Sequence, residues 1–192
     1  MDPNLPQPLN NIDGEDIAPI FDPAWQAAGI PRVLALACVL AESGLNPHAE
    51  RWGKHTTAAR SAIQWGDHAW LQSIINAGWA DISFGYAQRI VAYHYLGDRS
   101  ATVDNCLAVR AAVFANPARA LAEMCNDLAT VCLPQISGVN LSIIGGDRDL
   151  GALIVYNAGH WPDPLRESDW WVDWRGNVEH YMQTLARIRA SA

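Results

Sequence analysis

One acidic side chain lies where its pKa should be unusual. Glu42 follows an apolar run from Val33 to Ala41 and precedes a turn signal over residues 43–47, Ser-Gly-Leu-Asn-Pro. This pattern places a carboxylate at the C-terminal end of a buried helix, where the helix dipole and burial both raise its pKa. A carboxyl group that stays protonated near neutral pH can act as a general acid. The alternative is a glutamate that ends a helix and points into water.

The cysteines and histidines do not form a metal or redox motif. The four cysteines (Cys38, Cys106, Cys125 and Cys132) include no CxxC pair, and the six histidines are scattered without an HExxH motif. Within one helix, Cys125 and Cys132 would lie about 10 Å apart, too far for a disulfide. We therefore expect buried free thiols, no metal site and no cofactor.

Composition predicts a single globular domain and excludes some partners. Half of the 192 residues are hydrophobic and 17% are charged, which is typical of a packed protein. The net charge of −7 without a basic cluster argues against nucleic acid. The longest apolar run has nine residues, too short for membrane insertion. The first residues lack a basic and an apolar region, so we expect no Sec-type signal peptide.

Helical spacing predicts most of the elements. We expect an irregular lead-in over residues 1–15 and one domain over 16–192, mainly α with at most a small β-ribbon near 79–85. Helices are expected over about 23–28, 31–43, 58–76, 86–96, 103–115, 117–134, 147–158 and 178–189. Two of them carry stripes expected to face inward: Leu121, Met124, Cys125, Leu128, Val131 and Cys132 in one, and Val178, Tyr181, Met182, Leu185 and Ile188 in the other.

Short motifs follow Glu42 in a defined order. They are Glu42-Ser43 after the apolar run, Gly85-Tyr86-Ala87-Gln88, Tyr156-Asn157-Ala158-Gly159, and a tyrosine, Tyr181, in the last helix. Together they resemble the soluble lytic transglycosylase and goose-type lysozyme family, over about residues 24–188. The chain departs from the family pattern at Tyr86-Ala87, at Val155 and in a longer stretch between Glu42 and Gly85. These departures affect the sugar subsites and leave the acid in place.

The resemblance implies a lysozyme-like fold with a catalytic cleft between two helical lobes. It also implies cleavage of the β-1,4 bond between N-acetylmuramic acid and N-acetylglucosamine in peptidoglycan glycan strands, with Glu42 as general acid. Substrate binding would fall to the remaining motif residues, Ser43, Gly85, Tyr86, Gln88, Tyr156, Asn157 and Tyr181. The two late tyrosines would line the cleft and hydrogen-bond the acid, and the two amides would suit N-acetyl groups. The alternatives are core packing for the tyrosines and a turn-forming role for Asn157.

The second chemical step separates two enzymes. A goose-type lysozyme positions water with an aspartate near the G-x-x-Q segment, and Asp81 is our candidate base, with Asp67 a weaker one. A lytic transglycosylase needs no second carboxylate, because the C6 hydroxyl of the substrate attacks and leaves a 1,6-anhydro sugar. We favour hydrolysis, and the alternative role of Asp81 is a helix cap or a solvated loop residue. A chitin-cleaving relative and a catalytically silent wall-binding or virion module are the other hypotheses.

Nine tryptophans raise the question of sugar stacking. We expect Trp161, Trp170, Trp171 and Trp174 mainly to pin down a loop over 161–177, and one of Trp52, Trp65, Trp70 and Trp79 to belong to a lid. The acidity and the absence of a signal peptide favour a bacteriophage protein that acts on the bacterial cell wall. It would be carried in the virion beside other virion proteins, or released through a holin.

Overall fold

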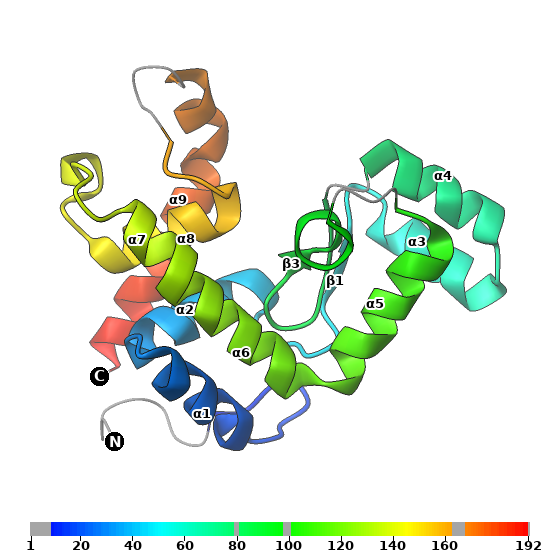
Figure 1. Ribbon diagram of the computed structural model, residues 1–192, viewed down its shortest axis with the longest axis horizontal. Helices are drawn as coiled ribbons and strands as arrows, with labels where there is room; N and C mark the ends of the chain where they lie inside the picture. Colours follow the sequence, from blue (N-terminus) through cyan, green and yellow to red (C-terminus); the bar gives the residue numbers. More distant parts are fainter. Residues whose placement is uncertain (1–8, 79–80, 98–100, 163–167, 192) are drawn as a thin grey trace.

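Helices dominate the structure, and a small antiparallel sheet lies between two groups of them (Figure 1). The computed structural model describes residues 9–78, 81–97, 101–162 and 168–191. The prediction of a mainly α fold with a small β element is confirmed. In the described part of the chain, no helix is both long and apolar enough to cross a bilayer.

The first group of helices, here called the large lobe, is built around α2 (Arg32–Ser43). Residues 34–39 of α2 are buried on every side, as the apolar run predicts. α1 packs on α6, and α2 packs on α9. The other members of the lobe are α1 (Ala18–Ala28), α6 (Pro117–Asp127), the π-helix η3 (Leu128–Cys132), α7 (Leu133–Gln135), the short 3-10 helix η4 (Ser142–Ile144), α8 (Arg148–Ala158) and α9 (Ser168–Ala190).

The second group, here called the small lobe, covers the described residues from 46 to 115. The strands β1 (Glu50–Trp52), β2 (Ile82–Phe84) and β3 (Arg89–Ile90) form an antiparallel sheet in that order. Its helices are α3 (Thr56–Trp65), α4 (His68–Gly78), the π-helix η2 (Ala92–Leu96) and α5 (Val103–Ala115). Trp52 and Phe84 pack edge to face in a hydrophobic core that is separate from the core of the large lobe.

Several helices agree with the sequence, and others differ for identifiable reasons. The expected helices at 31–43, 103–115 and 147–158 are confirmed as α2, α5 and α8. The single helix expected over 58–76 is wrong, because Gly66 adopts a left-handed φ of 67° that ends α3. Asp67 then caps α4 by accepting a hydrogen bond from the Trp70 backbone N–H (2.9 Å).

The helix expected over 86–96 is also wrong. Residues 86–88 form a turn with Gln88 at φ 45°, β3 follows, and only η2 is helical, as a π-helix. Strand β1 was not expected, since three residues are too few to show alternation. The helices α1 and α9 both begin earlier than predicted, so residues 168–177 are helical and not part of a loop.

The two inward stripes are correct except at one position each. Val131 is 45% exposed and Met182 is 50% exposed, while the other members are buried. The thiols of all four cysteines are free and buried, as expected.

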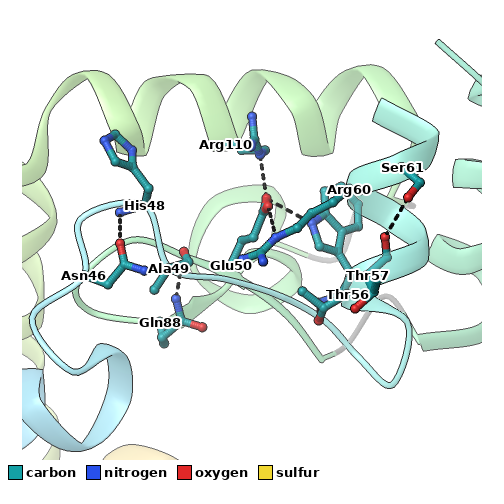
Figure 2. A network of polar contacts seen from close by, with 11 residues as sticks. Asn46, His48, Ala49, Glu50, Thr56, Thr57, Arg60, Ser61, Gln88 and Arg110 are labelled. Carbon is teal, nitrogen blue, oxygen red and sulfur yellow. Dashed lines mark hydrogen bonds and ion pairs between the residues drawn. The ribbon is translucent and has the colours of Figure 1, made fainter. Parts of the chain in front are cut away.

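A buried carboxylate holds the small lobe together (Figure 2). Glu50 on β1 accepts hydrogen bonds from Arg60 of α3 and Arg110 of α5, both at 2.7 Å, while its side chain is only 4% exposed. Burial raises the pKa of Glu50, but hydrogen bonds and charge from Arg110 and Arg60 outweigh it, so the pKa is lowered overall. Glu50 therefore favours folding as long as it is ionised.

We expect Glu50→Gln to destabilise the fold by about 2 kcal/mol at pH 7, since two cations lose a charged partner. The folded-state pKa lies below the unfolded value of about 4.3, so the stabilisation is complete above pH 5 and is lost as the pH falls through the folded-state pKa. Urea unfolding of both proteins should therefore show a large difference at pH 7 that shrinks below pH 4. Asp13→Asn, which changes an exposed carboxyl outside the network, is the control. An equal difference at both pH values would contradict the ionic role.

Candidate active site

A cavity of about 940 Å³ lies between the two lobes. Its walls come from the C-terminal ends of α2 and α8, the last helix α9, the three strands and both π-helices. Six of the predicted site residues contribute to these walls: Glu42, Asp81, Gln88, Tyr156, Asn157 and Tyr181. Residues from motifs that lie far apart in the sequence therefore meet at one cavity.

Glu42 lies in the last turn of α2, where the chain turns away sharply. Gly44 takes a left-handed φ of 61° and its N–H bonds to the carbonyl of Leu40, a usual way to end a helix. The Tyr181 hydroxyl donates a hydrogen bond to Glu42 Oε1, and Asn157 Nδ2 donates to the same oxygen at 3.5 Å. Helices α8 and α9 thus both hold the carboxyl group that α2 presents.

Burial raises the pKa of the Glu42 carboxyl above its usual range. The hydrogen bonds from Tyr181 and Asn157 and the charges of Arg51 and His180 act in the opposite direction, but their combined effect is smaller. The net rise agrees with the direction expected from the sequence, and desolvation is its main cause. The carboxyl can therefore hold a proton at a higher pH than an exposed glutamate.

The two tyrosines have different roles at the cavity. Tyr181 is 3% exposed and bonds the acid directly. Tyr156 lines the cavity, but its hydroxyl donates to the backbone carbonyl of Ala87 (2.8 Å), which joins α8 to the turn after β2. Of the two tyrosines expected to hydrogen-bond the acid, only Tyr181 does so.

Gln88 contacts the cavity, yet the protein uses most of its polar capacity. Its Nε2 donates to the carbonyls of Ala49 (3.1 Å) and Gly85 (2.9 Å), and its Oε1 accepts from the Ser83 hydroxyl (2.9 Å). Figure 2 shows the bond to Ala49 beside β1. Both amide hydrogens are therefore committed to the fold. Gln88 holds the turn against β1 and has little left to offer an N-acetyl group.

Three predicted binding residues, Ser43, Gly85 and Tyr86, are not among the residues that line the cavity. The Ser43 hydroxyl donates to the Val39 carbonyl within α2 (2.9 Å). Tyr86 is 1% exposed and packs in the core of the large lobe. Gly85 adopts a φ of 73°, and a Cβ there would lie 2.5 Å from Val113 Cγ1. A structural requirement explains each of these residues.

Asp81 is the carboxylate that faces the cavity from the small lobe. It is exposed, immediately precedes β2, and lines the same cavity as Glu42. A strand follows it, so the helix-cap interpretation is wrong. The weaker candidate, Asp67, caps α4 and is not among the lining residues.

A second charged side chain of the small lobe on the cavity wall, Arg89, was not predicted from the sequence. Arg89 on β3 donates to Asp127 Oδ2 (2.9 Å) and Glu123 Oε2 (2.5 Å) at the end of α6, so this ion pair joins the two lobes. The π-helices contribute Tyr93 and Val131, both exposed. No sequence pattern marks a π-helix, and β1 is too short to have shown that Arg51 lines the cavity.

The tryptophans do not form a lid in the described part of the chain. Trp52 lies in the core of the small lobe, Trp161 packs against that of the large lobe, and Trp65 and Trp70 are exposed but absent from the cavity wall. Trp79 and the side chains of Trp170, Trp171 and Trp174 lie outside the described part. Among the described residues, no group of three or more His, Cys, Asp or Glu side chains is placed to hold a metal ion.

We expect Tyr181→Phe to raise the pKa of Glu42 further, because the hydroxyl hydrogen bond favours the ionised carboxylate. Side-chain ¹³C carboxyl shifts followed over a pH titration would report this pKa, with the Glu42→Gln spectrum to assign the signal. Tyr156→Phe removes a cavity hydroxyl that bonds Ala87 instead, and it should change the pKa of Glu42 much less. A Glu42 pKa that is unchanged or lower in Tyr181→Phe would contradict the hydrogen bond.

No protein-family model, no curated protein and no solved structure matches the chain. What the chain does must therefore be inferred from the residues of the cavity and from the order of its motifs.

Proposed function

We propose that the protein is a glycosidase that cleaves the β-1,4 bond between N-acetylmuramic acid and N-acetylglucosamine in peptidoglycan. The observation that carries this proposal is the environment of Glu42. Its carboxyl is half-buried, has a pKa raised by desolvation, is held by Tyr181 and Asn157, and borders a cavity of about 940 Å³. A cavity of this size admits a ligand of several rings, and the resemblance to the lytic transglycosylase and goose-type lysozyme family supplies the substrate class.

Glu42 donates its proton to the glycosidic oxygen while an oxocarbenium-like transition state develops. Both hydrogen bonds that the described residues make to Glu42 end on Oε1. Oε2 is therefore the oxygen available to carry the proton. Once the proton has left, the Tyr181 hydroxyl stabilises the carboxylate, since it donates to a charged acceptor.

For the attack on the anomeric carbon we favour water, with Asp81 as the base, in the same displacement in which Glu42 protonates the leaving oxygen. Water would lose its proton to the Asp81 carboxylate and add to the anomeric carbon, as in an inverting hydrolase. The ion pair between Arg89 and Asp127 supports this choice, since it occupies the other aspartate on the cavity wall. Asp81 has no such cationic partner among the described residues. The alternative is intramolecular attack by the C6 hydroxyl, as in a lytic transglycosylase.

The proposed setting is the bacterial cell wall. An acidic chain gains nothing from long-range attraction to an anionic surface. Delivery in a phage particle beside other virion proteins, or release through a holin, would bring it to the glycan strands at high local concentration.

We expect Glu42→Gln to lower the rate of turbidity loss of purified cell walls by roughly 1,000-fold, within the range for a lost general acid. In the wild type the rate should fall as the pH rises through the raised pKa of Glu42, because the acid must be protonated. Glu15→Gln, at an exposed position outside the cavity, should retain full activity. Equal rates for the wild type and Glu42→Gln would favour a wall-binding module without catalysis.

Mass spectrometry of the released fragments separates the two modes of attack. Hydrolysis gives reducing ends, whereas transglycosylation gives products lighter by one water. We expect hydrolysis products from the wild type and a loss of roughly 100-fold or more in Asp81→Asn, since a general base contributes about that much. Anhydro products with unchanged activity in Asp81→Asn would refute the role of Asp81. Preferential cleavage of chitin oligomers would indicate the chitin-cleaving alternative.

A further inference from the structure

Arg51 projects into the cavity because of its place on a strand. Side chains alternate between the two faces of a strand, and both neighbours of Arg51 are buried in the small lobe: the Glu50 side chain is 4% exposed and Trp52 is 1% exposed. Arg51 is exposed and lines the cavity. Its partner across the sheet, Ser83, lines the cavity as well. The middle of β1 and β2 thus presents polar groups to whatever the cavity holds.

In the described part of the chain Arg51 forms no ion pair, whereas Arg89, the other arginine of the cavity wall, is committed to Glu123 and Asp127. Most other described arginines are also paired, namely Arg32, Arg60, Arg110, Arg119 and Arg189. The chain has a net charge of −7. An arginine that lines the cavity without an ion pair among the described residues therefore differs from most of the charged groups of this protein.

Arg51 and Glu42 line the same cavity. The positive charge of Arg51 lowers the pKa of Glu42 by less than burial raises it. A glycan strand bound in this cavity would therefore have both residues on its walls. A guanidinium binds carboxylates through two parallel N–H···O bonds.

We infer that Arg51 binds a carboxylate of the substrate and so makes the enzyme selective for anionic glycan strands over neutral ones such as chitin. This inference rests on the proposed function. The carboxylate can come from the stem peptide or from the lactyl ether of N-acetylmuramic acid. The lactyl carboxyl is free only where the peptide has been removed, because the peptide is attached to it as an amide.

The test compares wild type, Arg51→Gln and Arg51→Lys on five substrates. These are glycan strands with intact stem peptides, strands from which an amidase has removed the peptides, each kind after carbodiimide amidation of its carboxyls, and chitin oligomers. Arg187→Gln, which changes an exposed arginine of α9 away from the cavity, is the matched control. Steady-state kinetics then gives kcat and KM for each pair.

We expect Arg51→Gln to raise KM roughly 10- to 100-fold on the strand that bears the recognised carboxylate, with kcat little changed, as for the loss of a charge-assisted hydrogen bond. The KM of Arg51→Lys should lie between those of the wild type and Arg51→Gln, because lysine keeps the charge but cannot form two parallel hydrogen bonds. On amidated strands and chitin the variants should match the wild type. An effect on peptide-bearing strands alone assigns the stem carboxylate, and one on peptide-free strands alone assigns the lactyl carboxylate.

An unchanged KM, or the same change on charged and amidated strands, would overturn the inference. The second result would mean that Arg51 acts only through the pKa of Glu42. Calorimetric binding of charged and amidated glycan fragments to Glu42→Gln and to Glu42→Gln/Arg51→Gln tests carboxylate recognition without catalysis. It therefore separates failure of this inference from failure of the proposed function. If the wild type shows no turnover, the proposed function fails. A preference of Glu42→Gln for the charged fragment, lost in the double variant, still supports carboxylate recognition, and equal binding refutes it.

Discussion

The hydrogen bond between Tyr181 and Glu42 joins residues 139 positions apart and depends on most of the large lobe. It requires α2 to end at Glu42 and α9 to pack along α2, with Tyr181 turned inward. The same contacts enclose the carboxyl, so they create the desolvation that raises its pKa and the hydrogen bonds that partly offset it. Removing the acid from water and holding it in place are thus consequences of one packing arrangement.

The small lobe is attached to this frame by polar contacts that border the cavity. Arg89 reaches across to Glu123 and Asp127, and the Tyr156 hydroxyl reaches the backbone of Ala87. Within the lobe, the buried Glu50 pairs with arginines on two helices and leaves Arg51 on the opposite face of β1. One strand of three residues therefore supplies a structural ion pair and a ligand-facing cation.

Sequence patterns predicted the parts of the fold that depend on local periodicity. The apolar run predicted α2 and the position of Glu42, and the helix predicted from residue 117 begins there as α6, because helical stripes are encoded within a few residues. The turn at Gln88, the π-helices and β1 were missed, since long-range contacts determine them. A sequence offers no local signal for those contacts.

The candidate site was predictable to a similar extent. The motif order identified the residues that surround Glu42, but it did not separate those that face the cavity from those that support it. Gln88, Gly85 and Tyr86 belong to one motif, and the structure uses them respectively to hold β1, to pass close to Val113 and to fill the core. Arg51 belongs to no motif, and only the structure of β1 shows that its side chain lines the cavity.

The turn that contains this motif has a mechanical consequence. The turn is held by Tyr86 in the core of the large lobe, by the hydrogen bond from the Gln88 amide to the Ala49 carbonyl just before β1, and by the hydrogen bond from the Tyr156 hydroxyl to Ala87. Gln88 is the residue of this turn that lines the cavity, and the three contacts hold it in place. A sugar ring can leave its relaxed chair for a few kcal/mol. In the proposed reaction the sugar ring would therefore change shape more easily than this turn. The substrate would fit the cavity by distortion of its ring.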